Sequence, residues 1–183
     1  LGGNSFGLGR KVSGARMGVV GLGRIGQTIA RRGLGFDMEV RYHTRRPVAG
    51  VPWAHEPSLV ELATWCDFLV VITSGGPATR HLINEAVLNA LGPRSFLINV
   101  ARGTVVDEAA LIRALQDGRI AGAGLDVFEN EPQVPEALTG MDNVVLLPHI
   151  ASATHETRQA MGQRVMDNLE AFERTGQLIS SAY

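Results

Sequence analysis

The chain has 183 residues, enough for one domain and a piece of another, with 17 basic and 18 acidic side chains and a formal net charge of −1. This balance excludes a global field that would draw the protein to nucleic acid or to an anionic membrane, so we expect neither partner. The single cysteine, Cys66, excludes an internal disulfide framework. No apolar run is long enough to span a bilayer and no signal peptide is recognisable, which favours a cytoplasmic protein.

The first fifteen residues are Gly-rich and show neither a helix nor a strand period, so we interpret 1–15 as a linker in a chain that begins inside a longer protein. Over 16–150, short apolar runs alternate with helix-like stretches, which is typical of a parallel sheet with crossover helices. The predicted strands are Met17–Val20, Met38–Tyr42, Phe68–Ile72, Phe96–Asn99, Gly122–Val127 and Val144–Leu147. The predicted helices are Ile25–Leu34, Leu59–Thr64, Asn84–Ala90 and Glu108–Asp117. The predicted fold is a Rossmann-like, doubly wound α/β domain.

The pattern changes after Pro148. Thr154–Arg174 reads as one long helix whose apolar residues, among them Met161, Leu169 and Phe172, lie close to one stripe. We therefore assign 151–183 to a C-terminal helix that leaves the sheet domain.

A glycine loop joins the first predicted strand to the first helix. Gly21, Gly23 and Gly26 have the G-x-G-x-x-G spacing, in which one glycine permits a tight turn, one lets a pyrophosphate approach the backbone, and one lets helix and strand pack closely. The start of the helix would then direct N–H groups and the positive end of its dipole at phosphate oxygens. Such glycines also occur for packing reasons alone, but the strand-turn-helix context favours dinucleotide binding.

The second predicted strand ends at Thr44, Arg45 and Arg46, about 20 residues beyond the glycines. An NAD-specific domain usually places a carboxylate here to bind the ribose hydroxyl groups. A hydroxyl and two guanidinium groups would instead bind a 2′-phosphate, so the sequence predicts NADP as the preferred cofactor, with NAD possible. The alternative is that both arginines are only solvated and that Asp37 or Glu39 serves the ribose, although these acids lie at the wrong end of the strand.

Three later strands are each followed by polar residues. Arg102 follows the fourth strand, Asp126 lies at the end of the fifth with Glu131 beyond it, and His149 follows the sixth. The carboxyl ends of parallel strands share one edge of the sheet, where doubly wound domains bind ligands. Hydride transfer between a nicotinamide and a 2-keto or 2-hydroxy acid needs these residue types: arginine binds the carboxylate, histidine exchanges the hydroxyl proton, and a carboxylate orients the histidine and favours its protonated form. Singly, each residue also has an ordinary structural interpretation; jointly they indicate function.

With these motifs in place, the sequence resembles the D-isomer-specific 2-hydroxyacid dehydrogenases, and among them the hydroxypyruvate and glyoxylate reductases. The resemblance rests on GVVGLGRIGQTIARR, LINVARGTVVDEAAL, AGAGLDVFENEP and NVVLLPHIASAT. It implies that Arg102 binds substrate, that His149 is the acid/base and that Glu131 is its acidic partner. It further implies cofactor contacts at Gly21, Leu22, Gly23, Arg24, Ile25, Gly26, Thr44, Arg45, Arg46, Thr73, Val100, Asp126 and Ala151.

The resemblance also implies a homodimer that pairs through the cofactor domains. Members of the family carry a substrate-domain segment before the glycine loop, so we expect this chain to hold only flanking pieces of that domain and to turn over poorly alone. One rival is a non-catalytic corepressor that senses the dinucleotide, and a second is a dehydrogenase of another 2-hydroxy acid. The complete set of Arg102, Glu131 and His149 favours the enzyme.

Other signals are weaker. His155 and Glu156 begin an H-E-x-x pattern, but position 159 is Gln159 where a zinc helix needs its second histidine, so we expect no metal. Cys66 precedes a buried strand and is interpreted as a packed thiol rather than a nucleophile.

Overall fold

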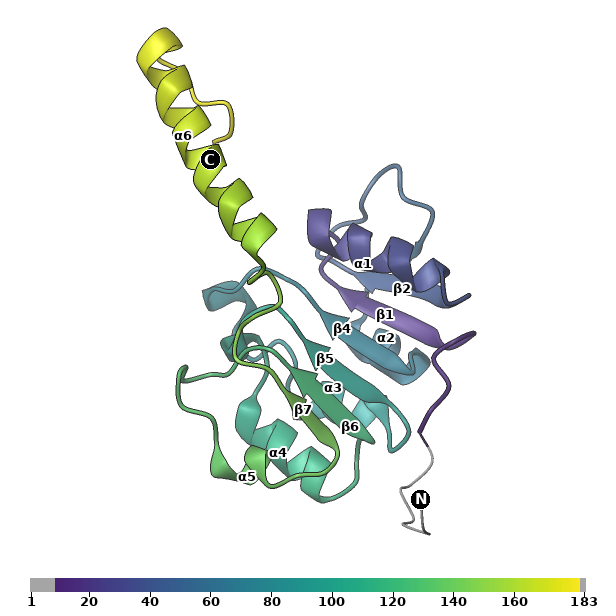
Figure 1. The fold of residues 1–183 in the computed structure, drawn as a ribbon. Helices are drawn as coiled ribbons and strands as arrows, with labels where there is room; N and C mark the ends of the chain where they lie inside the picture. The colour runs from purple at the N-terminus through teal and green to yellow at the C-terminus, as the bar shows by residue number, and fades with distance from the viewer. Residues whose placement is uncertain (1–8, 182–183) are drawn as a thin grey trace, which may run out of the picture. The chain divides into compact units, whose positions relative to one another are not determined.

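The computed structural model describes residues 9–181, which contain one sheet of seven parallel strands (Figure 1). The strands are β1 (Arg16–Val20), β2 (Glu39–His43), β3 (Ala54–His55), β4 (Phe68–Val71), β5 (Phe96–Asn99), β6 (Gly122–Leu125) and β7 (Val144–Leu146). Their order across the sheet is β3-β2-β1-β4-β5-β6-β7. Successive strands are added on one side of β1 up to β3 and on its other side from β4 onward. This switch between β1 and β4 confirms the predicted doubly wound fold and creates a crevice at the carboxyl ends of these two strands.

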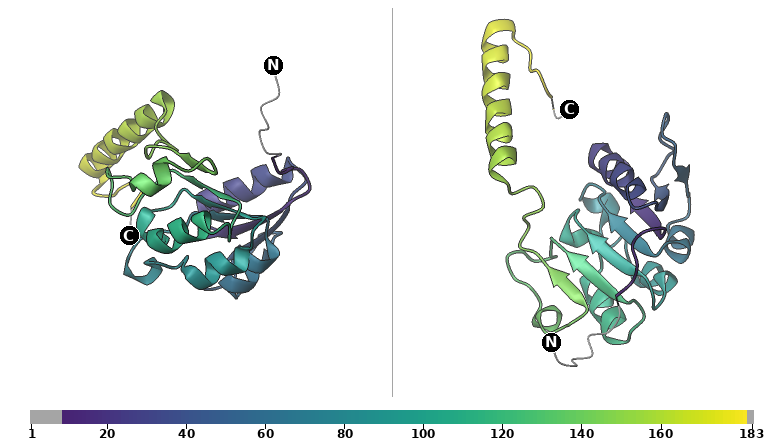
Figure 2. Two further views of the ribbon diagram at one scale, coloured as in Figure 1. Left: turned by 90° about the horizontal axis from the view of Figure 1, so that it is seen from below. Right: turned by 45° about the vertical axis from the view of Figure 1, so that its right-hand side comes forward.

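Helices cover both faces of the sheet. The helices of the sheet domain are α1 (Arg24–Leu34), α2 (Leu59–Trp65), α3 (Glu85–Leu91), α4 (Glu108–Gln116) and α5 (Glu136–Thr139), with 3₁₀ turns η1 (Pro77–Thr79) and η2 (Gly103–Val105). A further helix, α6 (His155–Thr175), belongs to a separate compact unit. Helix α1 lies on one face, and α2, α3 and α4 lie on the other, as the left-hand view of Figure 2 shows. Successive residues of a strand point to opposite faces of the sheet, so they pack in two different hydrophobic clusters. Val19 packs in the cluster between the sheet and α1, and Val20 packs in the cluster between the sheet and α2, α3 and α4.

Side-chain caps explain where most of these helices begin. Ser58, Asn84 and Asp107 each accept a hydrogen bond from a backbone N–H three residues later, at the starts of α2, α3 and α4. Helix α1 differs, because its cap is Gly23, which has no side chain to accept such a bond, and its first turn holds no acidic residue. The first N–H groups of α1 therefore stay available to an external anion.

Small elements in irregular sequence were not predicted. Strand β3 has only two residues, Ala54 and His55, and lies within a segment rich in proline and glycine, while η1, η2 and α5 have three or four residues each. Runs this short carry no readable period. The longer predicted strands and helices are present with ends shifted by one or two residues; for example, β6 ends at Leu125, two residues before the predicted end at Val127.

The described residues form two compact units, one that ends at Pro148 and one that begins at His149. The second unit contains α6, which starts with the Thr154 hydroxyl as its cap and ends at Gly176 in the left-handed conformation. The apolar residues of its predicted stripe, including Met161, Leu169 and Phe172, are exposed. In the part of the chain that the structure describes, no helix combines the length and apolar character needed to cross a membrane. The predicted linker at 1–15 lies partly outside the described residues.

The carboxylate of Asp67 binds the chain just before and at the start of β1. Asp67, which is only 6% exposed, accepts hydrogen bonds from the Arg16 backbone N–H (2.9 Å) and guanidinium group (3.0 Å), and from the Arg10 guanidinium group (2.6 Å). Burial by itself would raise the pKa of Asp67, but the hydrogen bonds from Arg16 and the charge of Arg10 outweigh it and lower the pKa. The ionised carboxylate is therefore the form that the fold stabilises.

We expect Asp67→Asn to lower the free energy of unfolding at neutral pH by about 2 kcal/mol, because it removes charge-assisted hydrogen bonds from a nearly buried group. A lowered folded-state pKa stabilises the fold above the unfolded-state value of about 3.9, and this contribution is lost as the pH falls through the folded-state pKa. Urea unfolding at a series of pH values should show the variant approaching the wild type in acid. Exposed Asp142→Asn is the control, and a gap that does not change with pH would contradict the account.

Candidate functional site: a cofactor pocket at the sheet crevice

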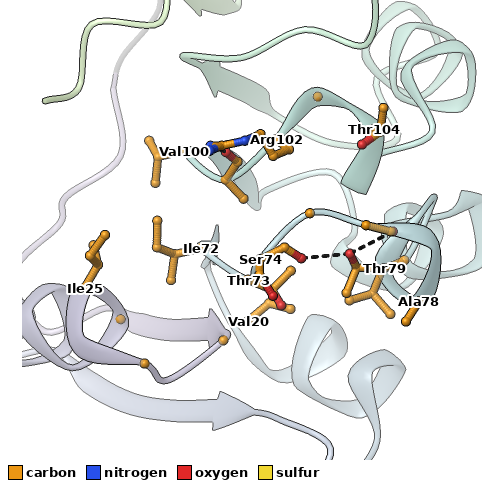
Figure 3. A pocket seen from close by; sticks show the side chains of 18 of the residues that line it. Val20, Ile25, Ile72, Thr73, Ser74, Ala78, Thr79, Val100, Arg102 and Thr104 are labelled. Carbon is orange, nitrogen blue, oxygen red and sulfur yellow. Dashed lines mark hydrogen bonds between the residues drawn. The ribbon is translucent and has the colours of Figure 1, made fainter. Parts of the chain in front are cut away.

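An open pocket of about 2160 Å³ occupies the crevice at the carboxyl ends of β1, β4 and β5. Its lining includes Gly21–Gly26 at the start of α1, 44–46 after β2, 72–79 after β4, 100–104 after β5 and 128–131 after β6. Figure 3 shows side chains from several of these segments around it. The volume exceeds the usual size of a site for one small ligand, which is about 300–1,000 Å³, and leaves room for a dinucleotide beside a substrate.

Each glycine of the loop has a distinct spatial role. Gly21 has φ +98°, and a Cβ atom there would lie 2.8 Å from the Thr73 backbone. A Cβ atom at Gly26 would overlap the Gly21 carbonyl oxygen, so α1 and the loop can pack only without it. At Gly23 an added Cβ meets nothing within 4 Å. The first and third glycines are thus needed for the fold of the loop, while the middle one leaves its backbone open to a ligand.

The chemistry of the glycine loop and of the pocket around it fits a dinucleotide. The uncapped N–H groups of α1 suit the oxygens of a pyrophosphate. Apolar side chains of Ile25, Ile72 and Val100 line the same pocket and offer packing surfaces for a planar ring (Figure 3). Ile25 is 63% exposed, which is unusual for isoleucine unless a ligand or another surface covers it.

The loop after β2 contributes two positively charged side chains, Arg45 and Arg46, to the pocket lining. Thr44, Arg45 and Arg46 all line the pocket, and both arginines are exposed. The two acids that could have served a ribose lie elsewhere: Asp37 precedes β2, and Glu39 at the start of β2 pairs with Arg41 (3.3 Å). Neither acid lines the pocket. The structure therefore brings two guanidinium groups, and not a carboxylate of β2, to this part of the crevice.

Arg102 is positioned by tight backbone contacts on either side of it. Buried Asn99 donates to the Arg102 carbonyl oxygen (3.2 Å) and accepts from the Ala101 N–H (3.1 Å). At Gly103 an added Cβ would collide with the backbone of Phe128, and at Gly75 it would lie 2.7 Å from Arg102 Cγ. The arginine side chain thus lies over a glycine of the β4 loop, and its own loop is packed against the loop that carries Glu131.

Glu131 lines the same pocket, and its Oε1 accepts a hydrogen bond from the Phe128 N–H (3.0 Å). Neighbouring Glu129 joins this loop to the one after β4, because it accepts from Arg80 (2.8 Å) and contacts His81 (2.9 Å). The fold therefore brings a guanidinium group and a carboxylate from two different strand ends into one cavity.

Among the predicted site residues of the first compact unit, only Asp126 is not part of the pocket lining. Asp126 is buried, with 3% exposure, directly after β6. His149 and Ala151 belong to the second compact unit. His149 has φ +55°, a left-handed conformation that few residues other than glycine adopt, and such backbone outliers are frequent at functional positions.

Sequence reasoning missed several residues that shape the pocket: Gly75, Gly76, Thr79, Asn99, Gly103 and Glu129. The single proton of the Thr79 hydroxyl is shared between the carbonyl oxygens of Ser74 (2.8 Å) and Gly76 (3.2 Å), shown as dashed lines in Figure 3, and so joins the two ends of the loop after β4. One signal was readable: Asn99 is a polar residue at the end of an apolar strand. The others act through contacts between segments distant in sequence.

Within the described part of the chain, neither Cys66 nor a cluster of metal-binding side chains offers a second site. Burial raises the pKa of the Cys66 thiol to about 12, so this group stays protonated and packed at neutral pH. Between residues 9 and 181, no three histidine, cysteine or acidic side chains gather closely enough to hold a metal ion.

The sheet order, the glycine loop and the crevice define a dinucleotide-binding domain of the Rossmann type. Residues 3–151 match the family model described as "D-isomer specific 2-hydroxyacid dehydrogenase, NAD binding domain". The chain therefore belongs to this family, as the sequence motifs indicated.

Several named proteins are similar to this chain over most of its length. Hydroxyphenylpyruvate reductase of Plectranthus scutellarioides is 51% identical over 91% of this chain and 53% of its own length. 2-Ketogluconate reductase of Gluconobacter oxydans is 51% identical over 90% of this chain and 53% of its own length. An NADPH-dependent glyoxylate/hydroxypyruvate reductase from Sinorhizobium meliloti, solved with NADP and malonate, is 54% identical with a TM-score of 0.88, over 91% of this chain and 52% of that one. The chain spans about half the length of these relatives.

Proposed function

We propose that this chain is the cofactor-binding part of an enzyme that reduces small 2-keto acids, of the glyoxylate or hydroxypyruvate type, with NADPH. One observation carries the proposal: a single pocket is lined at once by the glycine loop, by Arg45 and Arg46, and by Arg102 with Glu131. These are the groups that a dinucleotide phosphate and a keto acid carboxylate require. The NADPH-dependent relative from Sinorhizobium meliloti supports the same assignment.

In the proposed complex, the backbone of Gly21–Gly26 and the start of α1 bind the pyrophosphate. Thr44, Arg45 and Arg46 bind the 2′-phosphate, which a carboxylate at this position would repel. Thr73 lies on the adenosine side, Asp126 contacts the nicotinamide carboxamide, and Val100 and Ala151 contact the cofactor through their backbone or by packing. The bound nicotinamide supplies the hydride.

The residues of the chain supply binding and proton transfer. Arg102 binds the substrate carboxylate and polarises its keto group, and His149 donates the proton that the developing alkoxide oxygen takes up. Glu131 holds His149 in orientation. A protein that only senses the dinucleotide needs neither Arg102 nor Glu131 in its pocket, so their presence there favours the enzyme over a corepressor.

We further propose that the protein acts in the cytoplasm and forms a homodimer through its cofactor domains. The family resemblance supports both statements, and the single buried cysteine is compatible with a reducing compartment. The proposed partner is the small-molecule substrate, with no nucleic acid or membrane.

The function is tested by following the loss of NADPH absorbance when the intact protein is given glyoxylate or hydroxypyruvate. We expect turnover with a lower KM for NADPH than for NADH. Arg45→Ala combined with Arg46→Asp should raise the KM for NADPH about tenfold to hundredfold, because charged hydrogen bonds to the phosphate are lost, and should leave the KM for NADH nearly unchanged.

The matched control is Arg113→Met, which removes an exposed guanidinium group of α4 that pairs with Glu85 of α3, and neither residue lines the pocket. Equal KM values for the two cofactors in the wild type would contradict the NADP preference. Absence of turnover with either keto acid would contradict the proposed substrate class.

A further inference from the structure

The loop that carries Arg45 and Arg46 is fastened to the sheet at both of its ends. At its start, Nε2 of His55 lies 2.9 Å from the Thr44 carbonyl oxygen. A carbonyl oxygen can only accept, so Nε2 carries the proton of this hydrogen bond. At its far end, the Val48 N–H donates to the Tyr42 hydroxyl oxygen (2.9 Å). Between these points the Thr44 hydroxyl donates to the Arg46 carbonyl oxygen (2.7 Å).

The two side chains that hold the loop are themselves well positioned. Tyr42 is a β2 residue with only 1% exposure. His55 is its partner in the parallel pairing of β2 with β3, and the two ring centroids lie 5.2 Å apart at 48°. The unpredicted two-residue strand β3 thus places an imidazole where it can hold the backbone of the loop.

This arrangement matters because the arginines have no other support. Among the described residues, neither guanidinium group makes a hydrogen bond or an ion pair with the rest of the protein, and both side chains are exposed. Their position therefore depends on the backbone from which they extend. A loop already held in its binding conformation avoids the entropy cost of being ordered when a ligand arrives.

We propose that His55 is a positioning residue for cofactor discrimination, which holds the 44–48 loop so that its arginines meet the 2′-phosphate of NADP(H). The inference rests on the proposed function, because it presupposes a preference for NADPH. Tyr42 acts with His55 at the other end of the loop. NADH lacks the 2′-phosphate and gains little from the position of the arginines, so His55 affects the two cofactors unequally.

The test is a fluorescence titration of the 183-residue chain with NADPH and with NADH. His55→Phe keeps an aromatic ring against Tyr42 and removes the donor to the Thr44 carbonyl. We expect its Kd for NADPH to rise about threefold to tenfold, the effect of one lost neutral hydrogen bond, with the Kd for NADH unchanged. His55→Gln retains an amide donor at a similar distance from the backbone and should restore most of the wild-type ratio.

The outcomes separate this inference from the function on which it rests. A wild type that prefers NADPH, with His55→Phe retaining the same ratio of Kd values or weakening both cofactors equally, overturns the role of His55 and leaves the proposed function standing. A wild type that binds both cofactors equally overturns both. Should circular dichroism show that His55→Phe is unfolded, Tyr42→Phe decides: a lower preference for NADPH supports the fastened loop, and an unchanged preference overturns it.

Discussion

Replacing His149 with asparagine in the intact protein is expected to lower kcat/KM for a 2-keto acid by about 10²–10⁴-fold, the usual contribution of a positioned acid/base. Asparagine also tolerates the left-handed backbone conformation that His149 adopts, so the substitution removes the imidazole without straining the chain. Cofactor binding should change little, because the proton moves only in the chemical step. Steady-state kinetics with a parallel NADPH titration measures both quantities.

His155→Asn is the matched control for this prediction. His155 lies six positions further along the same unit, at the first residue of α6, and is exposed. We expect wild-type turnover from it. A His149→Asn enzyme that retains more than a tenth of the wild-type kcat/KM would show that another group transfers the proton.

Arg102→Met should lower kcat/KM for the keto acid by about 10²–10³-fold, the effect of removing one charged donor that stabilises a developing negative charge. Methionine keeps the aliphatic stem that lies over Gly75 and removes the guanidinium group. The loss should appear in KM, through the substrate carboxylate, and in kcat, through the polarised keto group. Titration with NADPH should give an unchanged Kd.

Arg102→Lys gives a second measurement on the same residue. Lysine retains the charge but lacks the planar fork that binds a carboxylate through two bonds, so we expect only partial activity. Full activity with Lys, or an NADPH affinity that falls together with the activity of the Met variant, would place Arg102 in cofactor binding instead. Arg113→Met again serves as the control for loss of an exposed arginine.

Much of the fold was predictable because its signals are local. An apolar strand followed by closely spaced glycines identified the loop from Gly21 to Gly26, and the structure shows the steric reason in the contacts that Cβ atoms would make there. The identity of the residues at Thr44–Arg46 already excluded a ribose-binding carboxylate after β2. Arg102 and Glu131 were found because each follows a buried strand, and strand ends in a parallel sheet share one edge.

The rest could not be predicted, because it depends on segments that meet only in three dimensions. Gly103 gives no sign in the sequence that its Cβ position is filled by the Phe128 backbone. Glu129 reads as one of several acids in a polar turn, yet it accepts from Arg80, 49 positions away. Strand β3 has two residues and no period, so its existence depends on pairing with β2.

The sequence by itself determined the doubly wound class, the glycine loop and the kinds of side chain at the strand ends, because periodicity, glycine geometry and residue chemistry act within a few positions of the chain. Only the tertiary structure decided how these side chains are held around the pocket: Asn99 and two glycines position Arg102, and His55 with Tyr42 fastens the loop of the two arginines. These contacts form between segments that are distant in the sequence. They depend on how closely one backbone approaches another in the folded protein, which no short stretch of sequence shows.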